Sequence, residues 1–204
     1  MRSEEKNQAF QVDENLISMI FDFIESFELI NLRRICKKWN QLLELKKQKI
    51  YTILCWNDYR KEHVCTITGS YNDFNKAKES LENSTKKLHQ ELPSYCAYET
   101  TKKNENLNIM EFDNEQAVII ELQQSELIFC YKLPKLIFLT LRTNYSGWRG
   151  SNEVEIKKVS IFPLEDFYDS NTCFKHQKHV DEYHYFKIIL NNPNENFKQF
   201  LNMF

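Results

Sequence analysis

The sequence predicts an α+β protein in which a short helical unit is followed by a β-rich antiparallel sandwich. From residue 12 to about residue 45, apolar side chains recur at helical spacing without Gly or Pro. After about residue 95, the chain holds seven short segments rich in Ile, Val, Phe, Tyr and Thr, separated by loop residues. The expected divisions are a flexible N-terminus at 1–11, a helical domain with its connector at 12–62, and a β-rich domain at 63–204.

Composition narrows the class of protein. Of the 204 residues, 42% are hydrophobic and 27% are charged, which is typical of a chain with a folded core. The net charge of −2 disfavours a nucleic-acid-binding protein, which usually carries a basic excess. No apolar run approaches the roughly 18–20 residues of a membrane span, and the N-terminus lacks the apolar core of a signal peptide. We therefore expect no membrane association and a cytoplasmic and/or nuclear location.

Glycine and cysteine usage excludes further classes. The chain has three Gly, none of them at the spacing of a phosphate-binding loop, so common nucleotide-binding enzymes are excluded. Its six Cys form no CxxC pair, and we expect reduced thiols that act mostly as small buried apolar residues.

The helical elements are expected in the following order. Asp13 and Ser26 are the candidate N-caps of two of the two or three short helices before residue 45. Residues 46–62 are compatible with a helix or a connector, and residues 63–68 with a strand. Residues 72–91 predict a polar helix capped by Asp73. Its inward-facing residues would be Phe74, Ala77, Leu81 and Leu88.

The β-type segments follow at 95–100, 107–112, 116–123, 126–132, 135–143, 153–162 and 183–190. Within 153–162 the alternation of apolar residues is interrupted near Lys157 and Lys158, which indicates a β-bulge. Residues 196–204 are compatible with a terminal helix or a docked tail.

The most informative motif lies between Val12 and Trp39. It contains, in order, Glu14, Leu16–Ile17, Ile20–Phe21, Phe23–Ile24, Glu28–Leu29, Leu32 and Ile35-Cys36-Lys37-Lys38-Trp39. This string resembles the F-box in both residue type and spacing. One position departs from the family pattern, because Val12-Asp13 replaces the initial Leu-Pro.

The resemblance implies a non-catalytic substrate adaptor of a cullin–RING (SCF-type) ubiquitin ligase, with no cofactor. An F-box binds a Skp-type adaptor, and through it a cullin, by burying an apolar helical face. The expected adaptor-binding residues are Val12, Leu16, Ile17, Ile20, Phe21, Leu29, Leu32, Ile35, Cys36 and Trp39. The same apolar stripe is also compatible with the simple core of a helical hairpin.

The region after the F-box-like string would bind the target protein. Residues 136–162 are similar to the closing strands of the jelly-roll modules that follow some F-boxes, sugar-binding ones included. The resemblance places Tyr145, Trp148 and Arg149 on an exposed loop as candidate target-binding residues, with a glycosylated target as one option. Alternatively, Trp148 packs inward and the neighbouring Gly residues shape a turn.

Two other functions remain open from the sequence. Cys173, His176, His179 and His184 offer thiolate and imidazole ligands for zinc, so a small zinc-dependent enzyme is one alternative. A polar loop before the last strand explains the same residues. The other alternative is a subunit of a non-ligase assembly, in which the helices serve only for docking. The Val12-Asp13 departure supports this second alternative.

Overall fold

The computed structural model describes residues 14–24, 26–35, 37–58, 63–91, 98–104, 106–112, 116–144, 153–162, 168–169, 174–176 and 182–193. The chain divides into two compact units. Residues 1–45 together with 129–133 form the first, called the helical unit here, and residues 46–128 together with 134–204 form the β unit.

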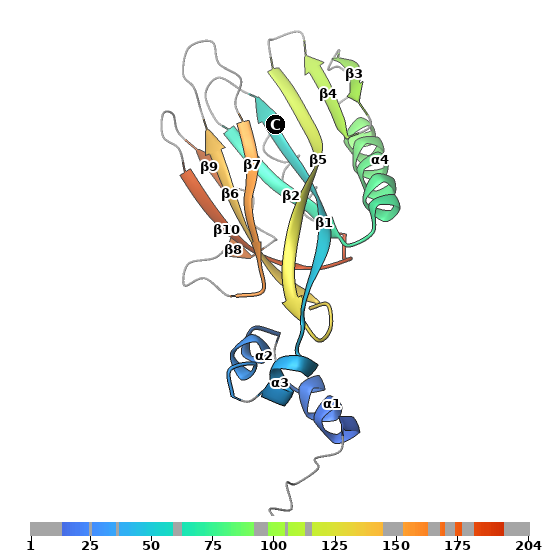
Figure 1. Cartoon of the computed structure of the whole chain (residues 1–204). Coiled ribbons are helices and arrows are strands. Elements are labelled where there is room, and N and C mark those ends of the chain that lie inside the picture. The colour runs from blue at the N-terminus through green and yellow to red at the C-terminus, as the bar shows by residue number, and fades with distance from the viewer. Residues whose placement is uncertain are drawn as a thin grey trace, which may run out of the picture. The chain divides into compact units, whose positions relative to one another are not determined.

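The helical unit contains three short helices, drawn in blue in Figure 1: α1 (Glu14–Asp22), α2 (Ser26–Leu32) and α3 (Lys37–Leu42). The turn after α1 is closed by the Phe23 N–H, which donates to the Ile20 carbonyl at 3.1 Å. Isolated helices shorter than about 12–15 residues are marginal in water. The stability of these helices must therefore come from the packing of their apolar faces.

The β unit contains a six-stranded sheet with the strand order β3-β4-β5-β1-β2-β9 (Figure 1). Its strands are β1 (Leu45–Asp58), β2 (His63–Tyr71), β3 (Tyr98–Asn104), β4 (Leu107–Phe112), β5 (Gln116–Cys130) and β9 (Phe174–His176). The pairs β1–β2, β2–β9, β3–β4 and β4–β5 are antiparallel. The predicted strands at 63–68 and 107–112 are thereby confirmed.

Helix α4 (Phe74–Glu91) covers one face of this sheet. Its inward side buries Ala77, Leu81 and Leu88 against residues of β1, β2 and β5 such as Ile53 and Val118. The predicted cap is confirmed, because the Lys76 N–H donates to Asp73 Oδ1 at 2.9 Å. Phe74, which was expected to face inward, is instead exposed and touches the Tyr51 ring edge-on.

A second sheet has four strands in the order β7-β6-β10-β8. These strands are β6 (Leu136–Asn144), β7 (Glu153–Ser160), β8 (Tyr168–Asp169) and β10 (Glu182–Ile189). Along β10, Phe186 and Ile188 are buried while Lys187 and Ile189 are exposed. This alternation is typical of a sheet with one covered face, and the two sheets form a β-sandwich, as the sequence predicts.

The β-bulge predicted in β7 is confirmed. Thr140 of β6 pairs with Lys158, while the next residue, Leu141, pairs with Ile156, so Lys157 is the extra residue. Bulges of this kind are common at sheet edges, and β7 is an edge strand.

Two sequence expectations about strands were wrong. Residues 46–62 were expected to form a helix or a connector, but residues 45–58 form strand β1, between β5 and β2. Residues 52–57 are all buried, so this segment is a continuous core strand without the alternation that would identify it. The segments 116–123 and 126–132 were expected to be separate strands, but residues 116–130 form one long strand, β5. The polar pair Gln124-Ser125 does not interrupt the strand, because neither residue breaks the backbone ladder as Gly or Pro would.

Candidate functional site

The helical unit has a small apolar core of its own. Ile17 and Phe21 of α1 and Leu29 of α2 are almost fully buried there, together with Leu43 and Cys130. Half-buried residues packed against this core include Leu32 and Trp39. The Trp39 ring meets the Phe21 ring edge-on, with the centroids 5.6 Å apart. Five of the predicted adaptor-binding residues thus take part in packing within the unit.

A second apolar surface, called the α1 face here, lies on the solvent side of the same helix. It consists of Leu16, Met19, Ile20 and Phe23, which are between 44% and 89% exposed. Leu16, Met19 and Ile20 form one stripe along α1, and Phe23 extends it in the turn after the helix. Exposed apolar stripes of this kind are typical of protein-binding sites.

Ile35, in the turn between α2 and α3, is a further exposed apolar residue. Of the ten predicted adaptor-binding residues, Leu16, Ile20 and Ile35 are therefore available to a partner as the chain stands. Val12 and Cys36 lie outside the described residues. The prediction omitted Met19 and Phe23. Their place in the helical stripe was visible in the sequence, but which side of α1 is exposed was not.

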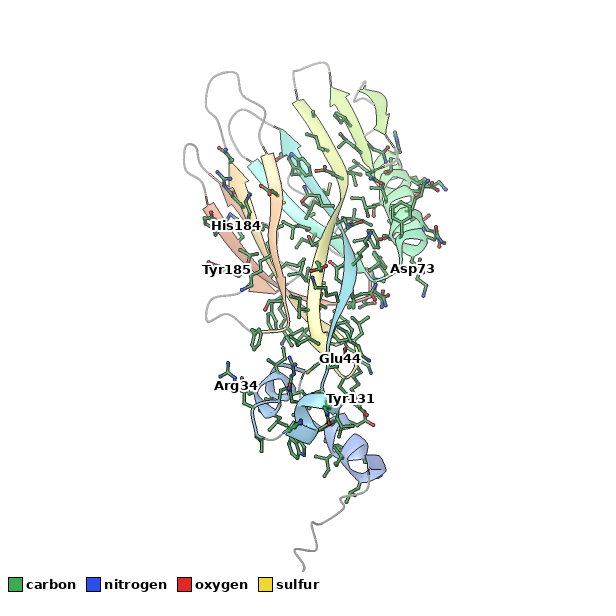
Figure 2. All side chains as sticks on the ribbon, in the orientation of Figure 1. Arg34, Glu44, Asp73, Tyr131, His184 and Tyr185 are labelled. Atoms are coloured by element: carbon green, nitrogen blue, oxygen red, sulfur yellow. The ribbon has the colours of Figure 1, made fainter. Side chains whose placement is uncertain are left out.

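The surroundings of Ile35 are basic. Arg34 and Lys37 are exposed near it in sequence, and Arg34 is labelled in Figure 2. Arg33 Nε donates to Asn40 Oδ1 at 3.1 Å and so ties the turn to α3. The α2–α3 turn thus combines an apolar side chain with positive charge.

Sequence reasoning missed residues 129–133, which belong to the helical unit although they connect β5 to β6. Cys130 is fully buried in the helical core. Burial raises the pKa of the Cys130 thiol above its ordinary value of 9.0, and the positive charge of Arg33 opposes this shift in part. Tyr131 packs edge-on against Phe21 at 5.4 Å between centroids, and Lys132 Nζ lies 2.6 Å from Asp22 Oδ1. No local pattern in the sequence links this segment to the helices.

The predicted target-binding residues Tyr145, Trp148 and Arg149 lie outside the described residues. Strand β6 ends at Asn144 and β7 begins at Glu153, so the three residues fall in the connection between two neighbouring strands. Their role in binding stays a prediction.

The predicted zinc ligands are only partly described. His176 is in β9 of the six-stranded sheet, and His184 is buried in β10 of the four-stranded sheet (Figure 2). His184 Nε2 lies 3.4 Å from Thr143 Oγ1. Cys173 and His179 are outside the described residues. Within the part of the chain that is described, no group of three or more His, Cys, Asp or Glu is arranged to hold a metal ion.

The helices of the described ranges are also too short or too polar to cross a membrane. Cys55, Cys65 and Cys130 are buried, as the sequence predicts for most of the cysteines.

Comparison with known proteins adds an independent observation. Residues 11–51 match the family model of the F-box domain. Neither the curated proteins nor the solved structures give a match. F-box domains bind Skp-type adaptors in SCF complexes and serve substrate recognition by these ubiquitin ligases in general. The family match therefore places an F-box domain at residues 11–51, which include the three helices and the start of β1.

Proposed function

We propose that this protein is a non-catalytic substrate-recognition subunit of an SCF-type ubiquitin ligase. The observation that supports this function best is the apolar α1 face, which lies within the F-box match and stays open to solvent. A Skp-type adaptor would bury this face and would link the protein to a cullin. Transfer of ubiquitin would then be catalysed by other subunits of the ligase.

The predicted adaptor-binding residues divide into two roles in this proposal. Leu16, Ile20 and Ile35 would contact the adaptor directly, together with Met19 and Phe23. The buried and half-buried residues would hold the helices in the shape that the adaptor recognises. These are Ile17, Phe21, Leu29, Leu32 and Trp39. Val12 and Cys36 stay in the proposal on the strength of the sequence motif alone.

The β unit would recruit the target protein. The connection between β6 and β7 supplies the candidate contacts, with Trp148 offering a ring that stacks on a sugar or an apolar side chain. Arg149 would donate paired hydrogen bonds to a carboxylate or phosphate group, and Tyr145 would add a second aromatic surface. A glycosylated target is one form of this proposal.

Affinity purification read by mass spectrometry tests the adaptor role. The wild-type chain is compared with a Leu16→Glu/Ile20→Glu variant, which places two charges on the α1 face without touching the core. Ile189→Glu is the matched control, because Ile189 is equally exposed but belongs to β10 of the β unit. Burying an unpaired charge in an interface costs several kcal/mol by rough estimate. Only the double variant should therefore lose the adaptor.

The outcomes separate the competing functions. Recovery of a Skp-type adaptor and a cullin with wild type and Ile189→Glu, but not with the double variant, supports the ligase subunit. An adaptor without a cullin contradicts it and favours a non-ligase assembly. If no adaptor is recovered with any folded form of the chain, the proposed function is wrong.

A further inference from the structure

The helical unit, which contains most of the F-box match, is not continuous in sequence. Its helices come from residues before 45, but its core is completed by Cys130, at the end of β5. The three helices have only nine, seven and six residues. A unit of this size buries too little apolar surface to be robust by itself. Each apolar contact from outside the helices therefore has a large share in keeping them folded.

Tyr131, the residue after Cys130, has a backbone conformation that is unfavourable for its type. Its φ angle is 65°, in the left-handed region. Gly occupies this region without cost and Asn often does, whereas a bulky side chain is an outlier there. Strain of this kind persists only where the surrounding structure compensates for it. The packing of the Tyr131 side chain is one source of this compensation.

The Tyr131 side chain contacts α1. Its ring packs edge-on against Phe21, with the centroids 5.4 Å apart and the planes at 75°. Phe21 also meets the Trp39 ring of α3, with the centroids 5.6 Å apart. Phe21 is therefore held between a ring from α3 and a ring from the β5–β6 connection, and it is 1% exposed.

The adjacent residue adds a polar contact at the same end of α1. Lys132 Nζ pairs with Asp22 Oδ1 at 2.6 Å, and Asp22 is the last residue of the helix. Both side chains are about half exposed, so this ion pair contributes little by itself. The ring contact of Tyr131 with Phe21 is therefore the larger contribution of this segment to the packing of α1.

We infer that Tyr131 is a positioning residue for adaptor docking: its ring holds the inner side of α1, so that the outer side presents the α1 face in one orientation. This inference rests on the proposed function as far as the adaptor is concerned. The structural part of the inference is that residues 129–133 complete the core of the helical unit. This part does not depend on the proposed function. Tyr131 contacts the buried side of α1, opposite the α1 face, and we assign it no contact with the adaptor.

Hydrogen exchange of the full-length chain, without any partner, tests the structural part. Tyr131→Gly removes the ring and at the same time relieves the backbone strain. Tyr131→Phe keeps the ring, and Lys135→Ala changes an exposed residue of the same β5–β6 connection just outside the helical unit. The aromatic contact and the buried area of a Tyr ring are together worth roughly a factor of ten or more in a local opening equilibrium.

We expect Tyr131→Gly to speed exchange of the α1 amides by about tenfold or more. The amides of β6 and β10 should exchange as in wild type, and Tyr131→Phe and Lys135→Ala should behave as wild type throughout. Unchanged α1 exchange in Tyr131→Gly would overturn the inference, because relief of strain would then be all that the substitution does. Equal acceleration in β6 and β10 would also overturn it, since Tyr131 would then support the whole chain.

Binding of the full-length variants to a purified Skp-type adaptor tests the functional part. Tyr131→Gly should bind about tenfold more weakly, in proportion to the loss of α1 protection, and Tyr131→Phe should restore wild-type affinity. Equal affinity of Tyr131→Gly and wild type would refute the positioning role. If wild type itself does not bind the adaptor, the proposed function is wrong. Selective opening of α1 in Tyr131→Gly would then still show that residues 129–133 complete the helical unit.

Discussion

Glu121, in the middle of β5, is a partly buried carboxyl group whose charged form is disfavoured by its surroundings. Burial raises its pKa above the ordinary value of 4.5, and a hydrogen bond from the Gln123 side chain opposes that shift in part. The folded chain therefore keeps the Glu121 proton to a higher pH than the unfolded chain does. The contribution of protonated Glu121 to the free energy of unfolding is complete below the ordinary pKa. This contribution is lost as the pH rises through the folded-state pKa.

The direction of this pKa shift predicts the effect of Glu121→Gln, because a Gln side chain cannot ionise. At about pH 7 the variant should be more stable than wild type, and the difference should shrink near pH 4, where the wild-type carboxyl is protonated. Urea unfolding at the two pH values measures this, with Glu82→Gln on the exposed side of α4 as the control. A variant that is less stable than wild type at both pH values would show that accepting the Gln123 hydrogen bond matters more than the charge.

At the scale of elements, β7 is an edge strand whose backbone is partly satisfied by a side chain. Gln123 of β5 donates from Nε2 to the Val154 carbonyl at 2.6 Å, and its Oε1 accepts from the Ile156 N–H at 2.9 Å. One amide side chain thus replaces a neighbouring strand at two backbone groups. Edge strands that are covered in this way are protected from pairing with other chains.

Gln123→Ala should therefore lower the free energy of unfolding by about 1–3 kcal/mol, because it leaves two part-buried backbone groups without this partner. The matched control is Gln124→Ala, since Gln124 is the next residue and is exposed. Urea denaturation gives the free energy, and hydrogen exchange of the Ile156 amide reports the loss locally. Equal effects of the two substitutions would mean that the link between β5 and β7 does not stabilise the sandwich.

The same scale shows how far sequence patterns reach. Helix α4 could be predicted with its cap and three of its four inward residues, because a cap and a helical period involve neighbours within a few turns. The bulge at Lys157 was also visible as a local break in alternation. Strand β1 was missed because it is a central strand between β2 and β5, and its buried residues 52–57 show no alternation. Strands β8 and β9 were missed because two or three residues carry no periodicity.

At the scale of the whole molecule, the two units suggest a division of tasks. In the proposed function, the F-box domain would provide a docking surface, and the β unit would provide a large scaffold whose function is not set by its fold. The residues predicted to bind the target fall in one strand connection of that scaffold. Connections between strands often carry binding residues because they can vary without loss of the core.

Replacing Trp148 by Ala tests this division. The variant should still recover the adaptor and the cullin but should lose a subset of the other proteins that copurify with wild type, because a stacking surface is gone. Tyr183→Ala is the control, since Tyr183 is an exposed aromatic residue of β10 in the same unit. If Tyr183→Ala loses those proteins and Trp148→Ala does not, the target binds the outer side of the four-stranded sheet.

The sequence by itself determined the F-box string, the change from helices to strands and most strand positions. Each of these depends on residue type and spacing within a short window. Only the tertiary structure decided which side of α1 is buried, because Leu16 and Ile17 are equally apolar neighbours and only packing separates them. It also brought Tyr131 to Phe21. Burial is a property of contacts between segments far apart in the chain, so no local pattern can specify it.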